Sequence, residues 1–321
     1  MDSLVFDVVF PLAVLVSGIV LLNFASDKAV EHSVHVASAL GISSLMIGLV
    51  LVSIGTDLPE IANSIVSCSS GHGDIDVGDS LGSILTQITL VLGLLPFLGR
   101  IFKVDRKEAL VIGSFQVATL VMAILVAMTG FTREKALLLI VTWPVSLWVI
   151  RRTTLRNLRE KKPVRRESGR HYLVDLVIAA LGFAGVAIGA LAVVQSVVSL
   201  SERFGVPEFL ISFFVLAIGT SLPELVVDLT AIRKRQYELV IGDVIGSCIV
   251  DATVSISIGQ LLFPAPVLVE GAQQALSLAF YTVFASMIAI ALLAWRQKVD
   301  RKTGVCLFIL YGLAYVFLYG L

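Results

Sequence analysis

Ten long apolar stretches constrain the fold of this chain more than any other feature of its sequence. A membrane-spanning helix needs about 20 mostly apolar residues. Stretches of roughly that length occur at residues 4–24, 37–68, 77–98, 108–130, 134–150, 172–199, 207–231, 239–263, 270–295 and 303–321. The composition agrees, because 57% of the residues are hydrophobic and 15% are charged, whereas a soluble domain averages about 45–50% and about 25%. We therefore predict an all-α integral membrane protein with ten transmembrane helices.

The basic residues are unevenly divided between the two ends of these predicted helices. The chain carries 24 Lys and Arg and 24 Asp and Glu, a neutral balance that excludes a basic nucleic-acid-binding protein. If the ten helices alternate in direction, 21 of the 24 basic residues fall on one side, nine of them at 151–171. Because loops rich in Lys and Arg stay in the cytoplasm, we expect 151–171 to be cytoplasmic and both termini to be outside. The short linker favours the inner membrane of a prokaryotic cell.

One segment of the sequence occurs twice, at an offset of 164 residues. Gly-Thr-Asp-Leu-Pro-Glu at 55–60 returns as Gly-Thr-Ser-Leu-Pro-Glu at 219–224, and a Gly-Asp-x-x-Gly-Ser motif at 78–83 returns at 242–247. Each copy covers the second and third helices of a five-helix half, and an odd number of crossings turns the second half upside down. Inverted repeats are typical of secondary transporters, whose sites lie on interrupted helices near the membrane midplane.

The repeat divides the chain into three predicted parts. They are a first five-helix repeat at 1–150, a basic cytoplasmic linker at 151–171 and a second, inverted five-helix repeat at 172–321. We expect helices 2 and 3 of the first half, and helices 7 and 8 of the second, to be broken and to lie at the centre.

Each copy of the repeat places a glutamate directly after a proline, inside an apolar stretch. These residues are Glu60 and Glu224, and no Lys or Arg inside the predicted helices compensates them. A charged side chain within a membrane costs about 2.5–3.5 kcal/mol and marks a functional site. Proline lacks an N–H and opens a helix, which is expected to free carbonyl oxygens around 53–56 and 217–220. The alternative is that the prolines and glycines only kink packed helices, and two matching copies disfavour it.

The remaining polar groups of the repeat complete an all-oxygen set. Hydroxyl groups near the glutamates belong to Thr56, Thr220, Ser221, Ser83 and Ser247. Calcium takes six to eight oxygen ligands, and the absence of His and Cys from the motifs argues against zinc or copper. The four histidines lie near the ends of the predicted helices. The sequence therefore predicts a cation site of the calcium type.

Five further polar residues have less certain places in this set, and four of them are equivalent in pairs. Gln87 and Asp251 lie one turn after the motif serines and are expected at the depth of the glutamates. Asp79 and Asp243 lie nearer the helix starts, where a supporting role is expected. Asp228 is close to the basic residues at 233–235, which predicts a structural or interfacial role. The motif glycines recur four residues apart, a spacing that lets helices approach closely.

The paired motifs resemble the two α-repeats of the sodium/calcium exchanger group within the cation/Ca²⁺ antiporter superfamily. The resemblance implies a secondary-active antiporter that exchanges Ca²⁺ for Na⁺ by alternating access, with helices 1 and 6 sliding against the other eight. It implies four clustered cation sites, with calcium held by Glu60, Glu224, Thr56 and Thr220. The counter-ion ligands that it implies are Asp57, Ser221, Ser83, Ser247, the backbone carbonyls of Ser53 and Ala217, and centrally Gln87 and Asp251.

Several positions depart from the common pattern of that family. Serine is common where Asp57 stands, and asparagine is common at Gln87, Asp79 and Asp243. The extra carboxylate of Asp57 could hold a proton or favour a second divalent ion, because close carboxylates raise one another's pKa. An antiporter that exchanges Ca²⁺ or another divalent ion for H⁺ is therefore the alternative function. A passive cation channel or sensor on the same scaffold ranks below both.

An intramembrane enzyme is the remaining class considered. Aspartyl proteases of that kind use a Gly-x-Gly-Asp motif, but Asp76 and Val240 stand where its first glycine would be. We therefore expect no enzymatic activity and no prosthetic group, with Ca²⁺ and Na⁺ or H⁺ as the transported ions. The expected partners are these cations and the lipid bilayer, with no nucleic acid, and the sequence indicates no protein partner.

Overall fold

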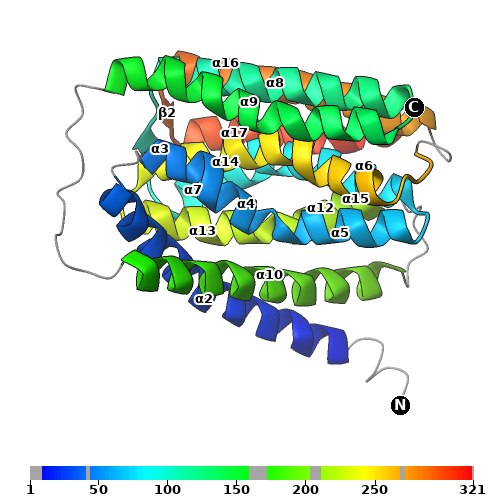
Figure 1. The fold of residues 1–321 in the computed structure, drawn as a ribbon, viewed down its shortest axis with the longest axis horizontal. Coiled ribbons are helices and arrows are strands. Elements are labelled where there is room, and N and C mark those ends of the chain that lie inside the picture. Colours follow the sequence, from blue (N-terminus) through cyan, green and yellow to red (C-terminus); the bar gives the residue numbers. More distant parts are fainter. Residues whose placement is uncertain (1–8, 41–43, 159–171, 203–210, 268–271, 320–321) are drawn as a thin grey trace.

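The computed structural model describes residues 9–40, 44–158, 172–202, 211–267 and 272–319, and nearly all of them are helical (Figure 1). The first half forms α2 (Phe10–Leu40), α3 (Ser44–Ile47), η2 (Gly48–Val52), α4 (Ser53–Thr56), α5 (Leu58–Ser69), α6 (Gly73–Leu85), η3 (Thr86–Val91), α7 (Leu92–Leu98), β1 (Phe102–Lys103), α8 (Arg106–Met128) and α9 (Arg133–Leu158). The second half forms α10 (Tyr172–Glu202), η4 (Ile211–Leu216), α12 (Ala217–Thr220), α13 (Leu222–Arg233), α14 (Tyr237–Val250), η5 (Asp251–Ser255), α15 (Ile256–Leu262), α16 (Ala272–Arg296), β2 (Lys298–Val299) and α17 (Arg301–Tyr319). The strands β1 and β2 pair antiparallel, with Phe102 opposite Val299.

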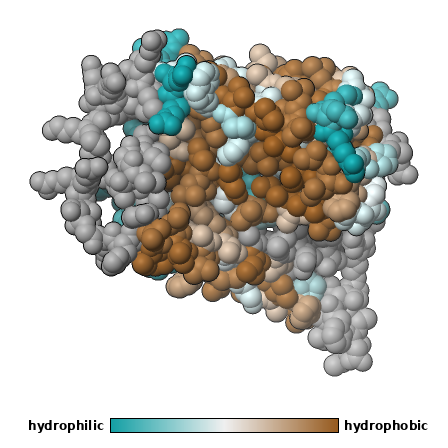
Figure 2. Space-filling view, viewed as in Figure 1, coloured by the Kyte–Doolittle hydropathy of each residue, from teal (hydrophilic) through white to brown (hydrophobic). Residues whose placement is uncertain are grey.

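Membrane-spanning helices account for most of this structure. Among the described residues, six helices are long and apolar enough to cross a membrane, and the bent pair 45–56 and 58–69 makes a seventh if it is one span. The other three predicted spans, 4–24, 172–199 and 303–321, overlap with the helices α2, α10 and α17. A wide apolar band covers the visible side of the molecule, and hydrophilic residues gather at its two ends (Figure 2). This surface suits a protein that contacts lipid along its length and water at both ends.

The boundary between the first two helices lies later than the sequence predicts. The predicted spans end at 24 and restart at 37, whereas α2 continues to Leu40. Lys28 and Glu31 pair at 3.1 Å across one turn on the exposed side of α2, while Ala29 and Val30 beside them are fully buried. The charges that suggested a loop therefore lie on the outer face of a continuous helix, because a pair three residues apart is compatible with helical geometry.

The two helix breaks of the repeat fall before the prolines, not at them. Asp57 and Ser221 leave the helical conformation, with ψ near 4° in both. Pro59 and Pro223 then stand in the first turn of α5 and α13, where the missing N–H has no partner to lose. Each proline thus begins a new helix, and the glutamate after it lies in that helix's first turn.

In the described residues, four segments of π-helix interrupt the central helices, and sequence patterns do not predict them. They are η2, η3, η4 and η5. η2 at 48–52 and η4 at 211–216 occupy equivalent places under the offset of 164, as do η3 at 86–91 and η5 at 251–255. A π-helix is rare and is found most often at functional sites. Both halves therefore carry the same local distortions beside the same motifs.

Glycines of the repeat let the two halves pack backbone against backbone. A methyl group at Gly82 would overlap the carbonyl oxygen of Phe213 in η4. A methyl group at Gly246, the equivalent glycine, would lie 3.0 Å from the Cα of Leu49 in η2, and Leu49 is equivalent to Phe213. Each half thus inserts its third helix against the second helix of the other half. The structure therefore confirms the close approach of helices predicted at these glycines.

Candidate functional site

Three carboxylates from the two halves meet at the helix breaks. Asp57 is the residue before α5, Glu60 lies in the first turn of α5, and Glu224 lies in the first turn of α13. Oxygen atoms of the three lie within 4.8 Å of one another, and the side chains are at most 1% exposed. The positive ends of the helix dipoles of α5 and α13 face this cluster, and each stabilises a nearby negative charge by about 0.3–1 kcal/mol.

These carboxylates lack the partners that buried acids normally have. Both oxygens of Asp57, both of Glu224 and one of Glu60 accept no hydrogen bond from the protein. Among the residues that the structure describes, no Lys, Arg or His forms an ion pair with any of the three. A buried charge without a partner costs several kcal/mol. The cluster is therefore suited to a cation that supplies the missing positive charge.

Hydroxyl groups surround the cluster in two equivalent pairs. Ser83 Oγ lies 3.1 Å from Thr220 Oγ1, and Thr56 Oγ1 lies 3.4 Å from Ser247 Oγ. The two pairs are equivalent, because an offset of 164 residues relates Ser83 to Ser247 and Thr56 to Thr220. Ser83 Oγ also donates to Glu60 Oε1 at 3.4 Å, and the buried hydroxyl of Ser221 has no partner. Each half thus supplies the serine that contacts the threonine of the other half.

Two hydrogen bonds join the two halves at the central position. Gln87 Nε2 donates to Asp251 Oδ2 at 3.1 Å, across a separation of 164 residues. Cys248 Sγ donates to Gln87 Oε1 at 3.3 Å, and the second oxygen of Asp251 has no partner. All three side chains are fully buried. Gln87 therefore presents its amide donor to the carboxylate, which leaves one carboxylate oxygen for a cation.

The two backbone carbonyls expected to be free are already engaged. Ser53 O accepts the N–H of Asp57 at 3.0 Å and the hydroxyl of Thr56 at 3.2 Å. Ala217 O accepts the N–H of Ser221 at 3.1 Å, and the hydroxyl oxygen of Thr220 lies 3.4 Å from it. The helical bonds persist because the helix ends at the threonine and the proline only begins the next one. A cation that binds these oxygens therefore lies beside the threonine hydroxyls.

Asp79 supports the site from beside it. Its carboxylate accepts a hydrogen bond from Asn63 Nδ2 at 2.8 Å and one from Thr220 Oγ1 at 3.1 Å. The side chain is 1% exposed. Asp79 thereby holds the threonine of the other half, which agrees with the supporting role expected for it. Asn63, three residues after Glu60 on the same face of α5, was not among the residues predicted from the sequence.

Asp228 and Asp243 differ from what the sequence suggested. Both side chains are fully buried, and all four of their carboxylate oxygens lack a hydrogen-bond partner. The nearby basic residues at 233–235 therefore do not pair with Asp228 within the described part of the chain. One signal was present in the sequence, because Asp228 stands four residues after Glu224 and thus on the same helix face. These two acids enlarge the negative surroundings of the cluster.

Comparisons with known proteins agree with one another. A family model described as sodium/calcium exchanger protein matches residues 10–151 and 174–320. The chain is 30% identical to the uncharacterized membrane protein MJ0091 of Methanocaldococcus jannaschii, over 92% of this chain and 94% of that protein. It is 25% identical to the sodium/calcium exchanger MaX1 of Methanosarcina acetivorans, over 93% and 95%. A solved structure of the sodium-calcium exchanger NCX_Mj matches with a TM-score of 0.75 and 28% identity, over 96% of this chain and 98% of that one.

Proposed function

This chain belongs to the sodium/calcium exchanger family and exchanges Ca²⁺ for Na⁺ across a membrane, and we propose that the two cations compete at the cluster of Asp57, Glu60 and Glu224. The observation that carries this proposal is the meeting of three buried, partnerless carboxylate groups from both halves within 4.8 Å. One Ca²⁺ or several Na⁺ can balance this charge, but both loads cannot occupy the same oxygens together. Competition for one set of ligands couples the two fluxes.

The same charge explains why exchange requires a loaded carrier. Each charged side chain at the centre of a membrane costs about 2.5–3.5 kcal/mol, so an empty cluster resists any movement that closes it off from water. A bound cation removes most of this penalty. The protein therefore reorients its binding site from one side of the membrane to the other only when Ca²⁺ or Na⁺ is bound. Uncoupled movement of either ion is thereby prevented.

The full ligand set that we propose combines the carboxylates with the groups around them. Ca²⁺ is held chiefly by Glu60 and Glu224, and Na⁺ is held by the remaining groups. The set comprises Ser53, Thr56, Asp57, Glu60, Ser83, Gln87, Ala217, Thr220, Ser221, Glu224, Ser247 and Asp251. Ten of these twelve contribute a side-chain oxygen that is at most 1% exposed, and Ser53 and Ala217 contribute backbone carbonyls. All of these ligand atoms are oxygens, the ligand type that Ca²⁺ takes in proteins.

We further propose that the chain crosses the membrane ten times as two inverted halves, 1–150 and 172–321, joined by the cytoplasmic linker at 151–171. The paired π-helices and the paired Ser–Thr contacts support the repeat. The direction of α2 and α10 also supports it. Ala29 of α2 packs on Gly182 of α10, and His32, further along α2, meets Asp175, further back along α10. The two helices are therefore antiparallel, as the first helices of inverted halves must be.

The orientation can be tested with a single labelled cysteine. Cys68 and Cys248 are buried and Cys306 is exposed, so Cys306→Ser gives a background without an accessible thiol. In that background, Ser168→Cys places a thiol in the linker. A membrane-impermeant maleimide added to intact cells is expected to label it only after permeabilisation. Labelling of intact cells would place the linker outside and refute the proposed orientation.

Transport in proteoliposomes tests the site itself. An outward Na⁺ gradient is expected to drive uptake of ⁴⁵Ca²⁺ by the wild type, and Glu60→Gln or Glu224→Gln is expected to abolish it. Glu134→Gln is the matched control, because Glu134 is exposed at the start of α9 and its loss should leave uptake unchanged. A pH gradient applied without Na⁺ separates this mechanism from H⁺ exchange. Retained uptake in either glutamate variant would exclude the shared site.

A further inference from the structure

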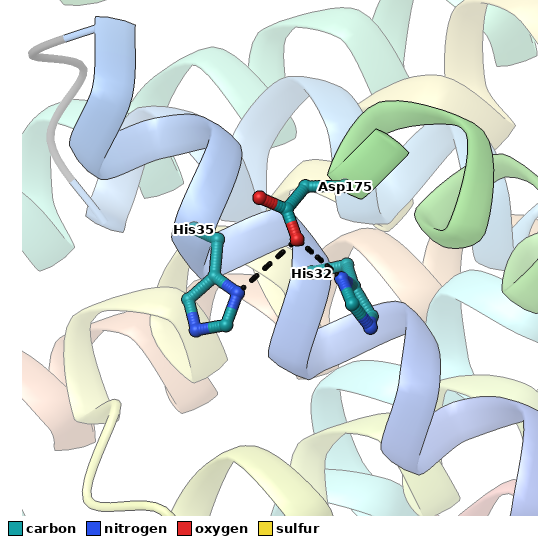
Figure 3. A group of neighbouring side chains, drawn as sticks. All are labelled: His32, His35 and Asp175. Carbon is teal, nitrogen blue, oxygen red and sulfur yellow. Dashed lines mark hydrogen bonds and ion pairs between the residues drawn. The ribbon is translucent and has the colours of Figure 1, made fainter. Parts of the chain in front are cut away.

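A second group of possible metal ligands lies between α2 and α10, apart from the carboxylate cluster. His32 Nδ1 lies 2.6 Å from Asp175 Oδ1, and His35 Nδ1 lies 3.4 Å from the same oxygen. Figure 3 shows both imidazole rings, from one helix, turned toward one oxygen of the carboxylate on the other helix. Ligand atoms of the three residues lie within 4.8 Å of one another. Nothing in the exchange mechanism uses them.

The spacing of these residues brings three ligand atoms to one point. His32 and His35 are three residues apart in α2, so their side chains occupy the same helix face. The two rings are edge to face, with centroids 5.6 Å apart. Each ring directs its Nδ1, the nitrogen nearer the backbone, toward Asp175. Two imidazole nitrogens and one carboxylate oxygen therefore converge from two different helices.

Close packing of the two helices holds this group in place. Gly182 of α10 lies so near α2 that a methyl group there would stand 2.8 Å from the Ala29 nitrogen, and Gly185 lies against the side chain of Ala25. Such small residues bring helix backbones close together. Asp175 stands two turns from Gly182 along α10, and His32 stands about one turn from Ala29 along α2. The position of the carboxylate relative to the rings is thus fixed by the helices and not by flexible loops.

The chemistry of the group selects a different class of ion from the transported ones. Imidazole nitrogen suits zinc, copper, nickel and iron, whereas Ca²⁺ and Mg²⁺ prefer oxygen ligands. Three protein ligands with water in the fourth position is a common arrangement for zinc. The side chain of His35 is 35% exposed, while those of His32 and Asp175 are 14% and 11% exposed. The group is therefore partly open at the surface of the molecule on the His35 side and enclosed on the other.

The distances require only a small adjustment for a tetrahedral ion. Zinc ligands at about 2.0–2.1 Å lie about 3.3 Å from one another when the angle between them is tetrahedral. The separation of His35 and Asp175, 3.4 Å, already has this value, whereas that of His32 and Asp175, 2.6 Å, must widen. A widening of about 0.7 Å to reach the tetrahedral spacing is within the range of side-chain rotation. On binding, the metal replaces the shared hydrogen-bond protons.

We propose that His32, His35 and Asp175 bind a divalent transition-metal ion of the zinc class, which links α2 to α10. The link joins the two helices that pack most extensively on each other, at the lower edge of the molecule in Figure 1. Metal binding then stabilises this helix pair as one unit. The proposal does not depend on the proposed transport site, because it concerns other residues and another class of ion.

Zinc binding to the purified full-length protein tests the proposal. The protein carries Cys306→Ser, which removes the exposed thiol, and saturating Ca²⁺ is present to occupy the carboxylate cluster. Zn²⁺ is expected to bind with a stoichiometry of one and to raise the midpoint of thermal unfolding. Co²⁺ in its place is expected to give the visible absorption of a tetrahedral site with nitrogen ligands.

Three variants decide whether the named residues are the ligands. His32→Ala, His35→Ala and Asp175→Asn are each expected to weaken Zn²⁺ binding at least tenfold and to remove the Co²⁺ absorption. His72→Ala is the matched control, because His72 precedes α6 and its loss should change neither. His35→Ala removes the most exposed ligand and should still exchange Ca²⁺ for Na⁺ at the wild-type rate without zinc, which shows that it folds. Equal Zn²⁺ affinity in the wild type and His35→Ala, or no binding in the wild type, would overturn the proposal.

Discussion

Replacing Asp57 by asparagine is expected to stabilise the protein without cations and to weaken its response to calcium. Asp57→Asn keeps the shape of the side chain but removes one of three negative charges that lie within 4.8 Å of one another. At that distance two unit charges repel by about 3.5 kcal/mol for an effective dielectric constant of 20. Asp57 faces both Glu60 and Glu224, so full ionisation makes the total about 7 kcal/mol. Proton uptake relieves part of this repulsion, so we expect the measurement to show only part of this sum.

The measurement is thermal unfolding in detergent, followed by tryptophan fluorescence, with and without Ca²⁺. Relief of only about 1 kcal/mol raises the midpoint by about 2 °C in a chain of this size. The same substitution removes a ligand charge, so the shift that Ca²⁺ produces should shrink and the Ca²⁺ affinity should fall about tenfold for each 1.4 kcal/mol lost. Opposite changes in the two conditions distinguish charge repulsion from a general loss of packing.

Asp27→Asn is the matched control for this experiment. Asp27 is exposed on α2, so its replacement should change neither the midpoint nor the calcium shift. If Asp57→Asn instead lowers the midpoint without cations and leaves the calcium shift intact, the three carboxylates do not act as one repulsive cluster. The reasoning about a cation-balanced site would then be wrong.

Three further predictions follow from contacts described above. Gly82→Ala is expected to destabilise the protein by about 1–3 kcal/mol in thermal unfolding and to reduce exchange, because the new methyl group overlaps a backbone carbonyl of η4. Gly312→Ala is the control and should be neutral in the same thermal assay, since open space surrounds that glycine. Thr220→Val is expected to raise the KM for Ca²⁺ in ⁴⁵Ca²⁺ uptake, because Asp79 and Ser83 each lose a hydroxyl partner at 3.1 Å. Thr153→Val is the control and should leave the KM unchanged, because Thr153 lies on the exposed end of α9. The pKa of Asp300 is held well below its usual range by the backbone N–H of Thr303 and by the cations Lys298 and Arg296. The ionised carboxylate of Asp300 therefore stabilises the fold above the ordinary carboxyl pKa, and this stabilisation is lost as the pH falls toward the lowered pKa. Asp300→Asn should lower the free energy of unfolding at pH 7 by about 1.5 kcal/mol, and the thermal midpoints of the variant and the wild type should converge in acid.

The repeated motif picks out, from the sequence alone, polar side chains that lie close together at the centre of the structure. Glu60 and Glu224 are brought together, and the Ser83–Thr220 pair and the Gln87–Asp251 pair are formed. Such residues are identifiable because a polar group inside an apolar stretch has few structural reasons to be there. Two copies in register make the argument stronger, since they mark equivalent depths in two inverted halves.

Other features of the site depend on packing between distant segments, and local sequence patterns do not reveal them. The π-helices are one example, since η2 and η4 are where glycines of the opposite half press against the backbone. The engaged carbonyl of Ser53 is another, because it depends on the rotamer of Thr56. The burial of Asp228 is a third example. Nearness to arginines in the sequence does not reveal that the helix turns this side chain inward.

The hydrogen bond between Gln87 and Asp251 has a consequence for the history of such a chain. The two residues occupy the same position of the repeat and contact each other. Two identical subunits would place glutamine against glutamine or aspartate against aspartate there, because a symmetry axis does not distinguish them. Joining the halves in one polypeptide removes that restriction, so a donor can evolve opposite an acceptor. Asp57 and Ser221 differ in the same way, and covalent fusion is thus what allows the two sides of the site to specialise.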